Sequence, residues 1–211
     1  QGLSETMQII ALVGNKGGTG KTTLAINLAS MLNEKAPTIL LDADPQGSSM
    51  QWKQVSDTSS LEVDEASEDT AARIDRTGGY DYCVVDCPPS VKSSQTREVL
   101  RRCDVALIPV QPSPLDMWAS IHVEREVAEA YRVNESMRAL LVINQLEPRT
   151  RLSQLALNAM DELELPCART AIRRRAAHRN AVLEGRSIAD VGWRGREAAK
   201  EIRQLIDELG F

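Results

Sequence analysis

The segment at residues 7–24, MQIIALVGNKGGTGKTTL, constrains the fold of this chain more than any other part of the sequence. Its apolar start predicts a strand at residues 8–13, and the pattern after the glycines predicts an amphipathic helix over residues 21–33. A strand, a glycine-rich turn and a helix in this order are the context of a phosphate-binding loop. Glycines are needed there because backbone N–H groups converge on an anion only with unusual dihedral angles and without interfering Cβ atoms.

The residues of this loop suit the triphosphate of a nucleotide. Gly17, Gly18 and Gly20 provide the unusual backbone angles, and the dipole of the following helix favours an anion at its N-terminus. Lys21 is predicted to neutralise the β and γ phosphates, and the Thr22 hydroxyl is predicted to ligate Mg²⁺. The expected nucleotide contacts in the loop are Asn15, Lys16, Gly17, Gly18, Thr19, Gly20, Lys21, Thr22 and Thr23.

Two further apolar runs end in carboxylates, and parallel sheets bind ligands at the edge where their strands end. The first, ILLDADPQGSS, ends in Asp42 and Asp44, which alone would fit an Asp-Pro turn equally well, but together with a phosphate loop they favour a functional role. The second, YDYCVVDCPPS, ends in Asp86. Because Mg²⁺ gives up its waters reluctantly, Asp86 is expected to hold the ion through its water shell. The predicted metal site comprises Thr22, Asp44 and Asp86.

Short apolar runs alternate with helical patterns along the whole chain. This order predicts an α/β fold, a doubly wound and mostly parallel sheet with helices on both faces. Strands are predicted at residues 8–13, 38–41, 82–86, 105–110, 140–144 and 167–171. Helices are predicted at residues 21–33, 93–101, 115–130, 151–162, 174–183 and 194–209. Residues 56–79 are more polar and predict one weak strand and one short helix.

Composition limits the classes of partner. The net charge of −5 excludes a basic footprint over the whole surface, so DNA binding would need a local patch. No stretch approaches the roughly 20 apolar residues of a membrane span. The four cysteines match neither a disulfide framework nor a complete metal site, which favours a reducing, cytoplasmic setting. We expect a single domain over residues 7–211, with residues 1–6 a tag remnant or disordered arm.

The run KGGTGKTT resembles the deviant Walker A motif of the ParA/MinD family of P-loop ATPases, and the resemblance extends over nearly the whole chain from Met7. It implies that Lys16 reaches the nucleotide of a partner subunit in a homodimer assembled by Mg-ATP. The segment DADPQ resembles the first switch of the family, which implies that Asp44 positions the attacking water. Lys16, Lys21 and Asp44 are therefore the expected catalytic residues. Asn144 resembles the adenine-contacting position, although a turn signal is equally compatible.

The segment VQPSPLDMWA resembles small ParA proteins, in which Asp116 would have either a direct role or that of a helix-terminal charge. The resemblance implies a slow ATP hydrolase, stimulated by an adaptor protein, that partitions a plasmid, a chromosome or an organelle such as the carboxysome. Only residues 1–6 precede the first strand, so we expect no N-terminal helix-turn-helix.

Three other functions fit parts of this sequence. A MinD-like, membrane-associated positioning ATPase is the main alternative. It needs a basic amphipathic tail, whereas residues 198–211 mix both charges, so no membrane partner is expected. The second alternative is a metabolic or redox relative, such as a nitrogenase iron protein or a dethiobiotin synthetase. The third is an ATP-gated scaffold that does not need hydrolysis.

An arginine-rich segment, RTAIRRRAAHR at residues 169–179, contains no acidic residue. A solvated helical face is the ordinary explanation, and contact with DNA phosphates is the functional one. Small ParA proteins bind DNA non-specifically through such residues, so the resemblance implies DNA binding and association with the nucleoid. The predicted DNA contacts are Arg149, Arg169, Arg173, Arg174, Arg175 and Arg179.

Overall fold

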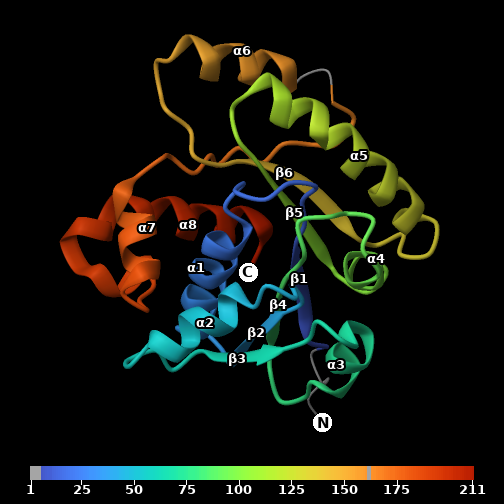
Figure 1. Cartoon of the computed structure of the whole chain (residues 1–211), viewed down its shortest axis with the longest axis vertical. Coiled ribbons are helices and arrows are strands. Elements are labelled where there is room, and N and C mark those ends of the chain that lie inside the picture. The colour runs from blue at the N-terminus through green and yellow to red at the C-terminus, as the bar shows by residue number, and fades with distance from the viewer. Residues whose placement is uncertain (1–5, 161–162) are drawn as a thin grey trace.

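A sheet of six parallel strands in the order β3-β2-β4-β1-β5-β6 lies at the centre of the structure (Figure 1). The structure is a computed structural model that describes residues 6–160 and 163–211, so most of the expected N-terminal arm lies outside the described residues. The strands are β1 (Gln8–Leu12), β2 (Thr38–Asp42), β3 (Glu62–Glu65), β4 (Tyr82–Asp86), β5 (Val105–Val110) and β6 (Arg138–Ile143).

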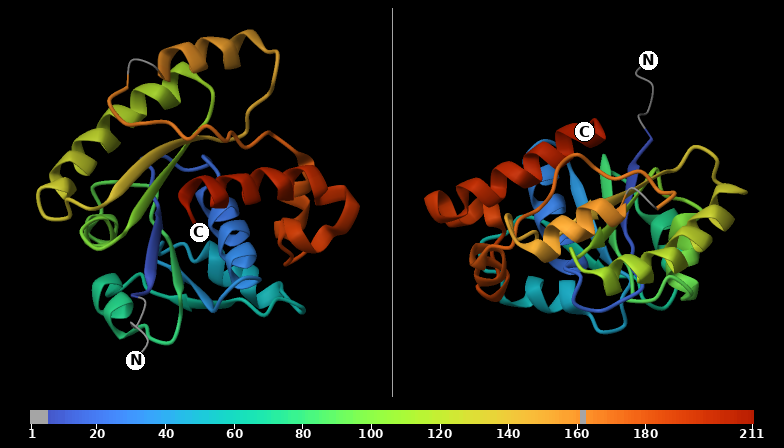
Figure 2. Two further views of the ribbon diagram at one scale, coloured as in Figure 1. Left: turned by 180° about the vertical axis from the view of Figure 1, so that it is seen from behind. Right: turned by 90° about the horizontal axis from the view of Figure 1, so that it is seen from above.

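Helices cover both faces of this sheet (Figure 2), which confirms the predicted doubly wound α/β fold. One face packs against α3, α4 and α5, and the other packs against α1 and α8. The helices are α1 (Lys21–Asn33), α2 (Ser48–Val55), α3 (Thr70–Arg76), α4 (Ser94–Leu100), α5 (Pro114–Tyr131), α6 (Arg151–Met160), α7 (Ala176–Leu183), the 3₁₀ helix η1 (Ile188–Gly195) and α8 (Arg196–Leu209). None of the helices in the described part of the chain is long and apolar enough to cross a membrane.

One predicted strand, at residues 167–171, does not form. Only Cys167 makes an isolated bridge to β6, with Leu141, because the N–H groups of Arg169 and Thr170 donate to Glu208 of α8 instead of to a strand. The weak strand and the short helix predicted in the polar segment do form, as the edge strand β3 and helix α3. Helix α2 was not predicted, because only Ser49 and Trp52 of its eight residues are buried and its sequence shows little helical periodicity.

The other predicted helices form, with ends that differ by one or two residues. The last two residues of the helix predicted at 151–162 lie outside the described residues.

The carboxyl ends of five neighbouring strands bring the predicted site together at one edge of the sheet. The loop after β1 lies beside Asp86 at the end of β4, since Leu12 pairs with Asp86 in the strand register. Asp42 at the end of β2 also pairs with Asp86. On the other side, β5 and β6 end at Gln111 and Asn144, which both contact the loop after β1.

Candidate functional site

Two of the three glycines predicted to give unusual backbone angles to the loop between β1 and α1 do so, whereas Gly17 does not have a positive φ angle. Gly18 and Gly20 have positive φ angles of 80° and 89°, in the left-handed region that favours glycine. Gly20 is also the N-cap of α1, and a Cβ atom at this position would collide with the side-chain nitrogen of Asn144. Any other residue at position 20 would therefore force the loop or Asn144 to move.

Side-chain amides hold the carbonyl groups of this loop. Asn144 donates to the Thr19 carbonyl at 2.7 Å, while Gln111 and Gln145 both donate to the Gly18 carbonyl, at 2.6 Å and 3.2 Å. Within the described part of the chain, no hydrogen bond uses the N–H groups of residues 14–20, which leaves these donors free for an anion. Gln111 and Gln145 were not predicted, although each follows a buried strand as Asn144 does.

Lys21 is a buried cation whose ammonium donates to a carbonyl. It is 7% exposed, and its Nζ lies 3.2 Å from the backbone oxygen of Lys16. Burial lowers the pKa of Lys21, although the carboxylates of Asp86 and Asp44 oppose this shift. A phosphate group at the free N–H groups of the loop would supply the negative charge that this ammonium lacks.

Thr22 and Asp86 meet as predicted for two residues of a metal site. The Oδ2 atom of Asp86 accepts hydrogen bonds from the Thr22 hydroxyl at 2.7 Å and from the Ser49 hydroxyl at 2.9 Å. The other oxygen of Asp86, Oδ1, is buried and has no hydrogen-bond partner in the described residues. Burial raises the pKa of Asp86 to about 7. A carboxylate oxygen without a partner beside a hydroxyl suits Mg²⁺, which would supply charge neutralisation for a phosphate.

Asp42 and Asp44 have different surroundings. Asp42 is fully buried and accepts the N–H groups of Asp44 at 3.2 Å and Met50 at 2.9 Å, so it braces the turn after β2. Asp44 is half-buried and its Oδ1 atom accepts the N–H of Gln46 at 3.0 Å. The described contacts do not join Asp44 to Asp86, and its place in the metal site stays a prediction.

Lys16 contacts its own chain. Its Nζ atom lies 2.8 Å from Oδ1 of Asp116 in the first turn of α5, and its side chain is 53% exposed. Asp116 is buried, and its other oxygen accepts the Ser113 hydroxyl at 2.6 Å. Asp116 was expected to have either a direct role or that of a helix-terminal charge, and its contact with Lys16 of the phosphate loop favours the direct role. The contact of Lys16 with a second subunit stays a prediction.

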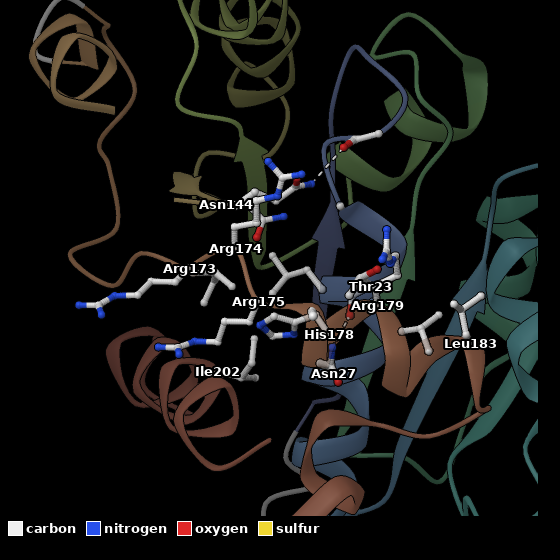
Figure 3. Close-up of a pocket in the computed structure, with 17 residues that line it drawn as sticks. Thr23, Asn27, Asn144, Arg173, Arg174, Arg175, His178, Arg179, Leu183 and Ile202 are labelled. Atoms are coloured by element: carbon white, nitrogen blue, oxygen red, sulfur yellow. Dashed lines mark hydrogen bonds between the residues drawn. The ribbon is translucent and has the colours of Figure 1, made fainter. Parts of the chain in front are cut away.

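A cavity of about 500 Å³ opens beside the loop (Figure 3). Gly18, Gly20 and Asn144 line one side of it, and the arginine-rich segment with His178 lines the other. Both ring nitrogens of His178 are buried without a hydrogen-bond partner in the described chain. Burial lowers the pKa of His178 and so favours the neutral imidazole, which has one donor and one acceptor. Whether Asn144 contacts adenine stays a prediction, since its amide nitrogen holds the loop.

Acidic residues from elsewhere in the chain neutralise most of the arginine-rich segment. Glu201 of α8 lies 3.8 Å from Arg173 and 2.7 Å from Arg175. Arg174 lies 2.5 Å from Glu147, and Arg169 lies 3.6 Å from Glu208. Arg149 and Arg179 are exposed and form no ion pair with any described carboxylate. Binding of DNA by these six arginines stays a prediction.

Comparison with known proteins gives related chains with the same architecture. A "Maintenance of carboxysome distribution protein A" of Halothiobacillus neapolitanus is 38% identical over an alignment of 215 positions that covers 95% of each chain. A protein of the same name from Gloeobacter kilaueensis is 36% identical, over 96% of this chain and 94% of the relative. The structure of Cyanothece McdA in complex with ATP has a TM-score of 0.79 at 16% identity, over 99% of this chain and 98% of that chain, and thus shares its fold.

The glycine-rich loop, the buried lysine and the two strand-end carboxylates all lie within one family pattern. The CobQ/CobB/MinD/ParA nucleotide binding domain matches residues 10–188, which include the loop, both carboxylates and every residue that lines the cavity except Ile202. On this match and on the two relatives that align over nearly their full lengths, the chain belongs to the CobQ/CobB/MinD/ParA family of nucleotide-binding domains.

Proposed function

We propose that this chain is a ParA-like ATPase that dimerises on Mg-ATP, binds DNA non-specifically and positions carboxysomes. The observation that carries the proposal is the identity of 38% over 95% of both chains with a carboxysome distribution protein. The loop supports it independently, since Lys16 and Lys21 both lie there. The cargo is inferred from the relatives, and the chemistry is inferred from the site.

The geometry supports Mg-ATP as the ligand. Free N–H groups in residues 14–20 and the buried Lys21 suit the phosphates, and Thr22 with Asp86 suits the metal ion. The cavity beside the loop has the volume of a small-molecule site, and His178 offers it a polar group without a partner. The structures of two family members, Cyanothece McdA with ATP and Pyrococcus horikoshii MinD with Mg-ADP, are consistent with this ligand.

The position of Lys16 supports dimerisation on ATP. Its ammonium is held by one ion pair, and its side chain is 53% exposed although Asp116 is buried. Because the lysine side of this pair is open to solvent, a nucleotide phosphate on a second copy can reach the ammonium and replace Asp116 as its partner. Closure of two copies would exclude water from the phosphates, and Asp44 would then orient the one water that attacks.

Slow hydrolysis and an adaptor protein complete the proposal. An ATP state that persists on DNA requires a basal turnover below about one per second. Arg149 and Arg179 are the exposed cations for DNA phosphate contact, while Arg169, Arg173, Arg174 and Arg175 are already paired with carboxylates. The proposal therefore includes association with the nucleoid in the cytoplasm.

A MinD-like membrane function finds less support. Helix α8 does not offer a membrane-binding face, because its apolar residues Ile202, Leu205, Ile206 and Leu209 are buried against the sheet and α1. The same helix also holds the cavity wall through Glu201 and Glu208. Sedimentation with anionic liposomes and ATP measures this alternative, and we expect the protein to stay in the supernatant.

The test uses the full chain and its Asp44→Ala variant. The wild type should hydrolyse Mg-ATP slowly and shift non-specific DNA in a mobility assay with ATP but not with ADP. Asp44→Ala should bind ATP, dimerise and bind DNA without hydrolysis. A wild-type protein that stays monomeric with Mg-ATP, or that binds DNA equally with both nucleotides, would contradict the proposal.

The cargo needs a separate measurement in cells that contain carboxysomes. Deletion of the gene should cluster the carboxysomes, and the wild-type chain should restore their spacing. Asp44→Ala should fail to restore it, because positioning depends on cycles of hydrolysis. Restoration by Asp44→Ala would instead favour the scaffold alternative.

A further inference from the structure

Ser49 joins two parts of the site that the sequence does not connect. It lies in the first turn of α2, is fully buried, and donates its hydroxyl proton to Oδ2 of Asp86 at 2.9 Å. Thr22 of α1 donates to the same oxygen at 2.7 Å. One carboxylate oxygen at the end of β4 therefore accepts a hydrogen bond from the phosphate-loop helix and another from α2.

A second carboxylate fixes the same turn of α2. The N–H of Met50 donates to Asp42 at 2.9 Å, and the N–H of Asp44 donates to the other oxygen of Asp42 at 3.2 Å. Asp42 and Asp86 are neighbours in the register of β2 and β4. The turn that carries Asp44 is thus hydrogen-bonded to Asp42 where it begins, and to Asp42 and Asp86 where α2 begins.

A purely structural role for Ser49 would be the satisfaction of one buried hydroxyl. Serine in a helix usually bonds to a nearby backbone group, which requires no distant partner. Ser49 instead bonds to a side chain 37 residues away, on the oxygen that Thr22 also uses. A ligand that binds Asp86 or Thr22 would therefore change the carboxylate oxygen to which Ser49 donates its hydrogen bond.

We propose that Ser49 is a positioning residue that links the state of the Thr22–Asp86 pair to the turn carrying Asp44. The inference rests on the proposed ATPase function, since it assigns Asp44 to the attacking water. Ser49 touches neither phosphate nor water in this role. It acts through the N-terminal turn of α2, which would move together with Asp86. That movement would in turn shift the neighbouring turn that carries Asp44.

The test compares Ser49→Ala with Ser48→Ala, a matched control in the same helical turn. Ser48 is exposed, so its removal changes the helix sequence in the same way without touching Asp86. In the nucleotide-free protein, hydrogen exchange of residues 43–50 should be about tenfold faster in Ser49→Ala, because this variant cannot form the hydrogen bond to the carboxylate. Ser48→Ala should exchange at the wild-type rate.

A second measurement separates positioning from packing. The Mg²⁺ concentration for half-maximal hydrolysis should rise several-fold in Ser49→Ala, while binding of a fluorescent ATP analogue without Mg²⁺ stays unchanged. Ser49→Cys, which keeps the buried volume but is a weak donor, should behave like Ser49→Ala. It also serves if the alanine variant folds poorly.

Wild-type exchange of residues 43–50 and a wild-type Mg²⁺ requirement in both Ser49 variants would overturn the proposal. The exchange measurement needs no nucleotide and no turnover. A wild-type protein without ATPase activity would therefore refute the proposed function, while the exchange data would still decide whether Ser49 holds this turn.

Discussion

The ammonium of Lys16 lies 2.8 Å from the carboxylate of Asp116 in the same chain, across 100 residues of sequence. The resemblance to ParA/MinD proteins assigns this lysine to the nucleotide of a partner subunit. In the proposed dimer, Lys16 would have to turn away from Asp116 to reach the partner's nucleotide, so we expect this ion pair to oppose dimerisation.

Asp116→Asn should make ATP-dependent dimerisation easier. The amide keeps the shape of the side chain but removes its charge, so Lys16 leaves α5 at a lower cost. Because two such pairs open in each dimer, the effect should be about 1–2 kcal/mol, or about five- to thirtyfold in the dimer dissociation constant. Sedimentation velocity with Mg-ATP measures it. Weaker dimerisation of Asp116→Asn would mean that Asp116 itself contributes to the interface.

Gly20→Ala and Gly17→Ala form a matched pair within the phosphate loop. A Cβ at Gly20 collides with the Asn144 amide, on a backbone with a φ of 89°, whereas a Cβ at Gly17 meets nothing within 4 Å. We expect Gly20→Ala to lose nucleotide binding and to reduce the free energy of unfolding by about 1–3 kcal/mol. Gly17→Ala should unfold like the wild type. Thermal unfolding and nucleotide titration test the pair, and equal behaviour of both variants would refute the assigned loop geometry.

Asp86 should make the nucleotide-free protein less stable as the pH rises. Its folded-state pKa of about 7 exceeds the usual 3.8, so between these values the folded chain binds a proton that the unfolded chain has released. This contribution is complete below about pH 4 and disappears as the pH rises through about 7. Its size is a few kcal/mol at about 1.4 kcal/mol for each pKa unit.

Urea unfolding at pH 5 and pH 8 in the presence of EDTA measures this dependence, with Asp86→Asn as the control. The asparagine variant should lack that part of the pH dependence, since it has no proton to release. If the wild type and Asp86→Asn show the same change in free energy of unfolding between the two pH values, Asp86 is already ionised in the free protein.

Arg149 and Arg179 should contribute more to DNA binding than Arg169 does. Neither forms an ion pair with a described carboxylate, whereas Arg169 lies 3.6 Å from Glu208. Replacing both by alanine should reduce the slope of log K against log salt by about 0.9 for each DNA phosphate that an arginine no longer neutralises. Arg169→Ala is the control, and a larger effect of this control on the slope would show that DNA displaces Glu208.

The phosphate loop could be predicted in detail because its chemistry is local. Glycines, Lys21 and the flanking periodicity occupy consecutive positions, so their joint meaning is visible in the sequence. The carboxylates at Asp42 and Asp86 were equally predictable, since a strand end fixes the edge of the sheet at which they lie.

The partners of the arginine-rich segment could not be predicted. The segment contains no acid, but Glu201 reaches Arg173 and Arg175 from 28 and 26 residues away, once α8 has packed. The same limit applies to Ser49, whose bond to Asp86 depends on how α2 docks. Long-range contacts of this kind depend on tertiary packing, which neither composition nor periodicity reports.

Glu201 and Glu208 connect the packing of α8 to the cavity beside the phosphate loop. Both carboxylates accept hydrogen bonds from backbone N–H groups of the segment that borders the cavity. Helix α8 therefore fixes the position of that wall. Loosening α8 would release the wall without touching a single loop residue. Binding of a ligand in the cavity and packing of α8 against the sheet should therefore favour each other. A molecule that binds the outer face of α8 would then change the affinity for the ligand without contacting the cavity.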